Sequence, residues 1–168
     1  MLNDAYRLKD EEKFTECQMV CQQILMKDHY NPVANYIMSE LALDEGKYHS
    51  AEVLIKRAIE TSPDCDELKF HLGNVLTEGE KGEEALEIFD ELLEKEPFPE
   101  IMKSKGHLLQ ELGRKEEAEN FYKEMIDRYP CAVVAFLGLS NLKQGLTSDD
   151  PYFKRFKKIS ENLLSEAE

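Results

Sequence analysis

Apolar and small residues recur along this chain at helical spacing, and the pattern itself repeats. In one segment Ala85 is followed by Phe89 four positions later and by Leu92 seven positions later. Such i, i+4, i+7 spacing forms one face of an α-helix. Comparable segments align without gaps, each beginning 33 or 34 residues after the one before: 13–29, 47–63, 81–97 and 114–130. The chain is therefore predicted to consist of repeated helical units, with a weaker fifth copy at 148–164.

A second helix is predicted immediately before each of these segments. The preceding residues also follow a helical pattern, and they place a small residue at matching positions: Ala5, Ser39, Gly73, Gly106 and Ser140. Because two helices pack closely only where side chains are small, we expect these residues to face small residues of the partner helix, such as Ala85 or Ala118. Each unit is thus a helical hairpin, which must stack on its neighbours to bury its remaining apolar side.

Prolines and glycines mark the expected helix ends. Pro63, Pro97 and Pro130 close three of the units, and proline cannot continue a helix interior. Gly46 and Gly113 follow first helices and fit the left-handed residue that commonly ends a helix. The pattern predicts five first helices, five second helices and short polar turns between them.

This unit resembles the tetratricopeptide repeat, a helical hairpin of about 34 residues. The matching residues are Leu72-Gly73, Ala85, Phe89 and Pro97 in one unit, and Gly106, Gly113, Ala118, Tyr122 and Pro130 in the next. The departures are the lack of Trp, the residues Cys17, Cys21 and His29 in the first unit, and Tyr152 in the last. Terminal repeats are commonly atypical. The rival architectures are an ordinary helical bundle and HEAT-type repeats, which are longer at about 40 residues.

The resemblance implies an all-α solenoid, a right-handed superhelix of about ten helices that forms a single domain over residues 1–168. The predicted repeats are 2–31, 32–65, 66–98, 99–132 and 133–166, with the last helix as a cap. In this family the first helices of the repeats, the A helices, line a concave groove that receives peptides. By position, the groove residues are predicted to be Asn3, Tyr6, Val33, Tyr36, Ile37, Glu40, Phe70, His71, Asn74, Lys103, His107 and Asn141.

The groove composition favours a peptide ligand, because tyrosine and phenylalanine offer rigid contact area and asparagine can hold exposed backbone groups. The alternatives are a solvated face, or binding through an edge, through the convex face or by self-association. Co-chaperones that grip acidic tails use a clamp of Lys, Asn and Arg, whereas this groove offers only Lys103. It is flanked by carboxylates, so a neutral or basic segment is the favoured ligand: Glu40, Glu67, Glu78, Glu100 and Glu111.

Charge and composition exclude several other functions. The formal net charge is -14, which opposes binding to the phosphate backbone, so no nucleic-acid partner is expected. A basic cluster at Lys154, Arg155, Lys157 and Lys158 could contact the acidic segment 83–96 of another copy, or both could be solvated faces. No run of about 18 apolar residues occurs, and the opening segment is highly charged. We therefore expect a cytoplasmic protein that does not insert into membranes.

No motif for catalysis is present, so we predict a non-enzymatic protein without cofactor or metal. The nearest approach to a metal site is His71 and His107, with Glu67 and Glu111 near them. Two groove histidines are more often peptide contacts. The cysteines at 17, 21, 65 and 131 lack metal-ligand spacing and are predicted to be free thiols; Cys17 and Cys21, one turn apart, could form a regulatory pair, although a buried apolar role is favoured.

A second resemblance concerns the segment LSNLKQGLTSDDPYFKRFKKI at 139–159. It is similar to the junction in proteins that fuse N-terminal tetratricopeptide repeats to a sulfotransferase domain. In that case the chain would be the partner- or substrate-binding repeat half of a larger enzyme. Asp149 or Asp150 can cap the following helix, with Pro151 at its first position. The leading prediction is a scaffold or adaptor for a peptide segment, and this enzyme-linked role is the alternative.

Overall fold

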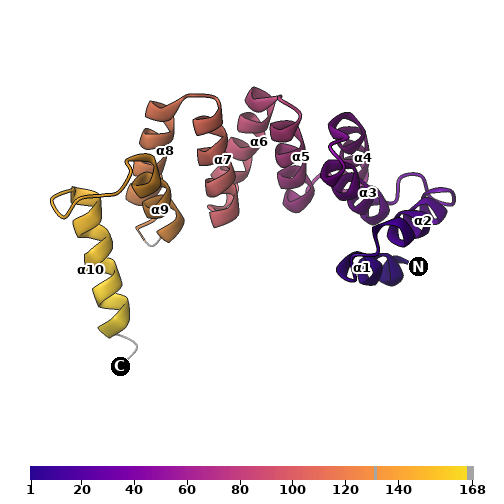
Figure 1. Cartoon of the computed structure of the whole chain (residues 1–168), viewed down its shortest axis with the longest axis horizontal. Helices are drawn as coiled ribbons and strands as arrows, with labels where there is room; N and C mark the ends of the chain where they lie inside the picture. Colours follow the sequence, from indigo (N-terminus) through magenta and orange to yellow (C-terminus); the bar gives the residue numbers. More distant parts are fainter. Residues whose placement is uncertain (131, 166–168) are drawn as a thin grey trace. The chain divides into compact units, whose positions relative to one another are not determined.

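The computed structural model describes residues 1–130 and 132–165, with side chains as far as Glu161. These residues form ten α-helices and no β-strand (Figure 1). The helices are α1 (Leu2–Asp10), α2 (Phe14–Leu25), α3 (Pro32–Asp44), α4 (Tyr48–Thr61), α5 (Asp66–Glu78), α6 (Gly82–Lys95), α7 (Pro99–Glu111), α8 (Lys115–Arg128), α9 (Val133–Leu142) and α10 (Pro151–Ser165). The predicted all-α architecture of helical hairpins is confirmed.

The chain divides into two compact units, Met1–Leu92 and Leu93–Glu168. In the first unit α1 packs against α2 and α3 against α4, while α2 also contacts α3 and α4 contacts α5. In the second unit α7 packs against α8, and α9 contacts α7, α8 and α10. Each hairpin thus touches the next within its unit. That all 168 residues form a single domain stays a prediction.

The helix ends follow the expected chemistry. Helices α4, α6 and α8 each end two residues before a proline. Gly46 and Gly113, just after α3 and α7, have φ angles of 71° and 74°, which residues with a side chain rarely adopt. At the start of α10, the backbone N–H of Tyr152 donates to Asp150 Oδ1 at 2.8 Å. Glycine, proline and the aspartate cap therefore fix where these helices begin and end.

Small residues meet small residues in the first two repeats, as predicted. Ala5, Cys17 and Ala51 are fully buried. The Cys17 thiol donates to the Ala5 carbonyl, with Sγ and O 3.3 Å apart. The Ser39 hydroxyl donates to the Ala51 carbonyl, with the two oxygens 2.8 Å apart. Side chains this short let α1 approach α2, and α3 approach α4, closely enough for a side chain to bond the opposite backbone.

In the third and fourth repeats the atoms nearest to the glycines belong to aromatic rings, and contact with Ala85 and Ala118 stays a prediction. A Cβ atom added to Gly73 would lie 2.5 Å from the Phe89 ring, and one added to Gly106 would lie 1.9 Å from the Tyr122 hydroxyl oxygen. The glycines therefore make room for aromatic rings, which sit four residues after Ala85 and Ala118. Gly138 of α9 also faces Tyr122, since its added Cβ would lie 2.2 Å from ring atom Cζ.

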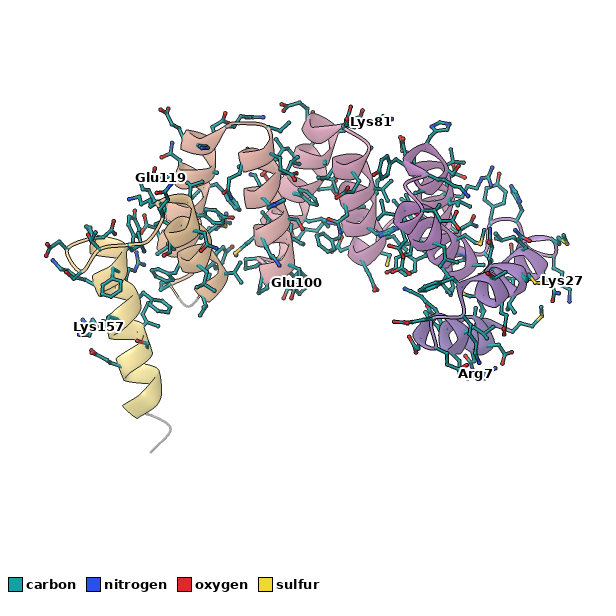
Figure 2. All side chains as sticks on the ribbon, in the orientation of Figure 1. Arg7, Lys27, Lys81, Glu100, Glu119 and Lys157 are labelled. Atoms are coloured by element: carbon teal, nitrogen blue, oxygen red, sulfur yellow. The ribbon has the colours of Figure 1, made fainter. Side chains whose placement is uncertain are left out.

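Ion pairs tie neighbouring helices together in both units. Glu52 on α4 is 8% exposed and pairs with Lys56 at 2.6 Å and with Lys81, in the turn before α6, at 2.8 Å. Hydrogen bonds from these two ammonium groups lower the pKa of the Glu52 carboxyl. In the second unit, Glu119 on α8 pairs with Lys143 in the turn after α9 at 3.4 Å (Lys81 and Glu119 are labelled in Figure 2). The Glu52–Lys81 and Glu119–Lys143 pairs join successive repeats, whereas the Glu52–Lys56 pair lies within α4.

Candidate interaction site

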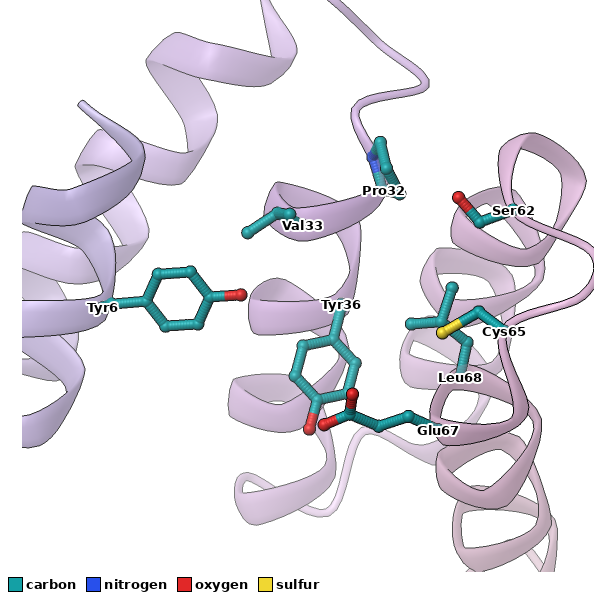
Figure 3. A pocket seen from close by; sticks show the side chains of 8 residues that line it. All are labelled: Tyr6, Pro32, Val33, Tyr36, Ser62, Cys65, Glu67 and Leu68. Atoms are coloured by element: carbon teal, nitrogen blue, oxygen red, sulfur yellow. The ribbon is translucent and has the colours of Figure 1, made fainter.

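A pocket of about 210 Å³ opens on the A helices of the first unit. Figure 3 shows Tyr6 reaching in from α1, Tyr36 from α3 and Glu67 from α5. The full lining consists of Tyr6, Pro32, Val33, Tyr36, Ser62, Cys65, Glu67 and Leu68. Three successive repeats therefore line one cavity with two phenol rings, a carboxylate and several aliphatic side chains.

Tyr36 is held in place by polar partners on two helices. Its hydroxyl donates to Glu40 Oε1 at 3.1 Å, and Glu40 forms an ion pair with Lys9 of α1. The Lys9 ammonium lies 5.8 Å from the centroid of the Tyr36 ring. Burial, together with the Glu40 carboxylate, raises the pKa of Tyr36 above its ordinary value of 10. The phenol therefore stays neutral and serves as a hydrogen-bond donor to Glu40.

His71 continues this network into the interior. Its ring lies edge-on to Tyr36, with the centroids 5.1 Å apart, and its Nε2 is 3.0 Å from Ser39 Oγ. Since the only hydroxyl proton of Ser39 is donated to Ala51, Nε2 of His71 must carry the proton in the bond to Ser39. Burial lowers the pKa of His71 despite the opposing Glu40 carboxylate. Neutral His71 on α5 therefore donates its Nε2–H to Ser39 on α3, which in turn bonds to Ala51 on α4, so this chain of hydrogen bonds joins the three helices.

The predicted groove residues differ widely in exposure. Ile37 is fully buried and His71 is 8% exposed, so Ile37 is a core residue that offers no surface to a ligand. These two residues are 34 positions apart and occupy the same place in successive repeats. Half-buried are Val33, Tyr36, Glu40, Phe70 and Asn74, and exposed are Asn3, Tyr6, Lys103, His107 and Asn141.

Only part of the predicted set meets at one place. Tyr6, Val33 and Tyr36 line the same pocket, whereas Phe70 packs on Phe89 with ring centroids 6.0 Å apart. Lys103, His107 and Asn141 belong to the second unit, where Nδ1 of His107 lies 3.4 Å from the Glu111 carboxylate. The site with defined geometry is therefore the pocket of the first unit.

Several pocket residues were not among the predicted groove contacts. Glu67 was noted only as a flanking charge, yet it stands 34 residues after Val33 and so occupies the same repeat position. The repeat register was therefore a signal that could have found it. Ser62 and Cys65 lie between α4 and α5, where the register gives no guide to side-chain position.

A second, larger and mostly apolar cavity of about 580 Å³ lies in the second unit, where α7, α8 and α9 come together. It was not predicted from the sequence. Its lining is Pro97, Pro99, Met102, Arg128, Tyr129, Pro130, Ala132, Val133 and Val134. The prolines that end α6 and α8 prevent the backbone from continuing as helix at this place, and their rings form part of the wall.

The described residues contain no group of three or more His, Cys, Asp or Glu side chains that could hold a metal ion. Cys17 and Cys21 are free and fully buried. Burial raises the pKa of Cys21 to about 12, so it holds its proton and is a poor nucleophile. Cys65 is also free and half-buried, while Cys131 lies outside the described residues.

Within the described residues, no helix is long and apolar enough to cross a membrane. The cytoplasmic location stays a prediction.

Two family models, both described as tetratricopeptide repeat, match residues 42–105 and 102–130 and together cover more than half of the chain. The chain belongs to the tetratricopeptide repeat family. A sequence search of the curated proteins gave no match. The repeats and the fold support a protein-interaction scaffold.

Solved structures of other repeat proteins share this fold. A crystal structure of MamA superposes with a TM-score of 0.71 at 16% identity, covering 97% of this chain and 96% of MamA. Another MamA structure gives a TM-score of 0.67 at 17% identity, with 99% and 98% covered. YrrB, described as a TPR protein with an unusual peptide-binding site, gives a TM-score of 0.67 at 20% identity, with 84% and 73% covered. At these identities the likeness shows the fold alone.

Proposed function

We propose that this protein is a non-enzymatic scaffold that binds a peptide segment of a partner on the A helices of its first unit. The observation that carries the proposal is the convergence of Tyr6, Tyr36 and Glu67 from three repeats on one open pocket. Aromatic side chains anchor many protein interfaces because they give large contact area at a small loss of conformational freedom. The family resemblance also implies that peptides bind on the surface formed by the A helices.

The fixed geometry of Tyr36 supports the same proposal. Its ring is held by Glu40, Lys9 and His71 before any ligand arrives. Ordering a flexible side chain on binding costs about 0.5–1.5 kcal/mol. A side chain that is already ordered avoids most of that loss, so the pocket is prepared for a ligand without being rearranged.

Self-association through the basic cluster of α10 has weaker support. Arg155 forms an ion pair with Asp127 of the same chain, and the Lys157 ammonium nitrogen lies 3.8 Å from a carboxylate oxygen of Glu161. Part of the positive charge of the cluster is therefore compensated within the chain. These pairs favour a solvated face, and we retain peptide binding as the proposed function.

The test compares two tyrosine variants in partner capture from cells of the source organism. Tyr6→Ala removes a pocket residue, whereas Tyr30→Ala removes a tyrosine of similar exposure, 50% against 44%, that does not line the pocket. We expect wild type and Tyr30→Ala to capture the same partners and Tyr6→Ala to lose some of them. Identical partners for all three proteins would reject binding at this pocket.

The sulfotransferase-linked alternative rests on the segment 139–159. The cap formed by Asp150 supports only its local chemistry, since Asp before Pro begins helices in many proteins. An immunoblot of the native polypeptide decides between the roles. A band near 19.5 kDa fits a self-contained scaffold, and a band tens of kilodaltons larger fits a repeat domain that serves an attached one.

A further inference from the structure

We propose that the pocket of the first unit binds one positively charged side chain of the partner peptide, with its charge at Glu67 and its aliphatic stem against Val33 and Leu68. This inference rests on the proposed peptide-binding function and specifies what the pocket recognises. It is argued from the size of the pocket, its charge and its aromatic walls.

The size of the pocket fits a side chain better than a whole ligand. Small-molecule sites usually enclose about 300–1,000 Å³, and this cavity encloses about 210 Å³. It is also open to the surface formed by α1, α3 and α5. One residue of an extended peptide can therefore enter while the rest of the peptide stays outside.

The charge of the pocket comes from Glu67. Glu40 is already engaged by the Lys9 ammonium and the Tyr36 hydroxyl. Glu67 is exposed at the pocket, and within the described part of the chain it forms no ion pair or hydrogen bond. An acidic side chain would meet this carboxylate at close range, whereas a basic one would gain a charge-assisted hydrogen bond. The net charge of -14 also attracts cationic segments from a distance.

The walls suit the remainder of a basic side chain. Val33, Leu68 and Pro32 give the apolar contacts that the methylene groups of lysine and arginine require. Tyr6 and Tyr36 offer aromatic rings, which attract cations within about 6 Å of the ring centroid. The chain itself places the Lys9 ammonium 5.8 Å from the Tyr36 ring. The positive charge of Lys9 is balanced by Glu40, so the unbalanced carboxylate at the pocket remains that of Glu67.

The first measurement uses two small probes that differ mainly in charge. N-acetyl-arginine amide carries a guanidinium, and N-acetyl-citrulline amide has a neutral group of nearly the same shape. We expect NMR titration of the whole chain with the arginine probe to shift the amide signals of Tyr6, Tyr36 and Glu67, with an affinity about tenfold or more above that of citrulline. Equal shifts from both probes, or shifts confined to other regions, would overturn the inference.

Two glutamate variants make the assignment specific. Glu67→Gln removes the pocket charge with little change of shape, and Glu16→Gln removes an exposed carboxylate of α2 that does not line the pocket. We expect the Glu67→Gln variant to bind the arginine probe about tenfold more weakly and the Glu16→Gln variant to bind it as wild type does. An unchanged affinity in the Glu67→Gln variant would contradict the role of this carboxylate.

A selection of random displayed peptides on the whole chain separates this inference from the function on which it rests. Selected peptides that share a basic residue and lose binding to the Glu67→Gln variant support both. Peptides that lose binding to the Tyr6→Ala variant but have no basic residue in common keep the proposed function and reject the inference. Failure to select any peptide that depends on Tyr6 rejects both.

Discussion

The helices around His71 and the helices around Tyr122 pack closely together in two different ways. In the first unit, His71 of α5 reaches the short side chain of Ser39, whose hydroxyl bonds to the Ala51 carbonyl. In the second unit, Tyr122 of α8 fills the space above Gly106 and Gly138 on α7 and α9. The contact around His71 depends on hydrogen bonds, and the contact around Tyr122 depends on glycines that have no side chain. The stability of the first should therefore change with pH and with loss of a hydrogen-bond partner, and the stability of the second should fall when a side chain is added.

The largest effect is expected from adding volume beside Tyr122. Alanine favours a helix over glycine by about 1 kcal/mol, but the new Cβ of Gly106→Ala would lie 1.9 Å from the Tyr122 hydroxyl oxygen. The Tyr122 ring cannot easily move away, because Gly138 also packs closely against it. We expect the free energy of unfolding to fall by about 3 kcal/mol, measured by urea denaturation. Because we predict a single domain, a spectroscopic probe placed in residues 1–92 should report the same loss.

A double-mutant cycle provides the control for this prediction. Tyr122→Leu removes the ring, so Gly106→Ala should cost much less in the Tyr122→Leu background than in wild type. Equal costs in the two backgrounds would show that the overlap with Tyr122 is not the cause.

A smaller loss is expected from Ser39→Ala. The variant leaves the buried Nε2–H of His71 without its acceptor, which should cost about 1–3 kcal/mol. Ser160→Ala removes a serine that also bonds to a backbone carbonyl, but in an exposed position, and it should change stability by less than about 0.5 kcal/mol. Chemical denaturation of both variants checks the contrast, and similar losses would argue against a stabilising role for the buried bond.

A pH dependence follows from the lowered pKa of His71. Below its ordinary pKa of about 6.5, the unfolded chain binds a proton at this histidine while the folded chain does not, until the pH reaches the lower folded value. The stability supported by neutral His71 is therefore complete above pH 6.5 and is lost as the pH falls through that window. We expect the urea midpoint of wild type to fall more steeply there than that of His71→Gln. His49→Gln, which changes an exposed histidine, should behave as wild type.

The smallest effect is expected from Arg155→Ala on α10. Its ion pair with Asp127 has side chains 35% and 63% exposed, and exposed pairs contribute about 0–1 kcal/mol. The thermal midpoint should therefore shift only slightly, and the shift should shrink further at high salt. A loss as large as that of Ser39→Ala would mean that this pair is essential for holding α10.

The repeat period made most of the fold predictable. Local signals placed the helices, because proline excludes a helix interior and because Gly46 and Gly113 adopt the left-handed backbone that ends a helix. The contact partners of Gly73 and Gly106 could not be predicted in the same way. Their nearest neighbours are the Phe89 and Tyr122 rings, and which side chain comes nearest depends on how far two helices slide along each other.

The candidate site was predicted less completely than the fold. Tyr6 and Tyr36 were identified from their place in the A helices, but Ile37, assigned to the same face, is fully buried. Adjacent positions on a helix point about 100° apart, so an error of one position in the assignment of the face moves a residue from the surface into the core. Repeat register specifies equivalence between residues and not their exposure.

By itself the sequence determined the helices, the hairpin unit and the family, because these depend on local backbone chemistry and a periodic apolar pattern. The tertiary structure decided that His71 joins Ser39, that Glu40 is neutralised by Lys9, and that Glu67 remains available at the pocket. These relationships link residues about 30 positions apart on three different helices. Side chains so distant in sequence acquire their charge balance and exposure only when the hairpins stack.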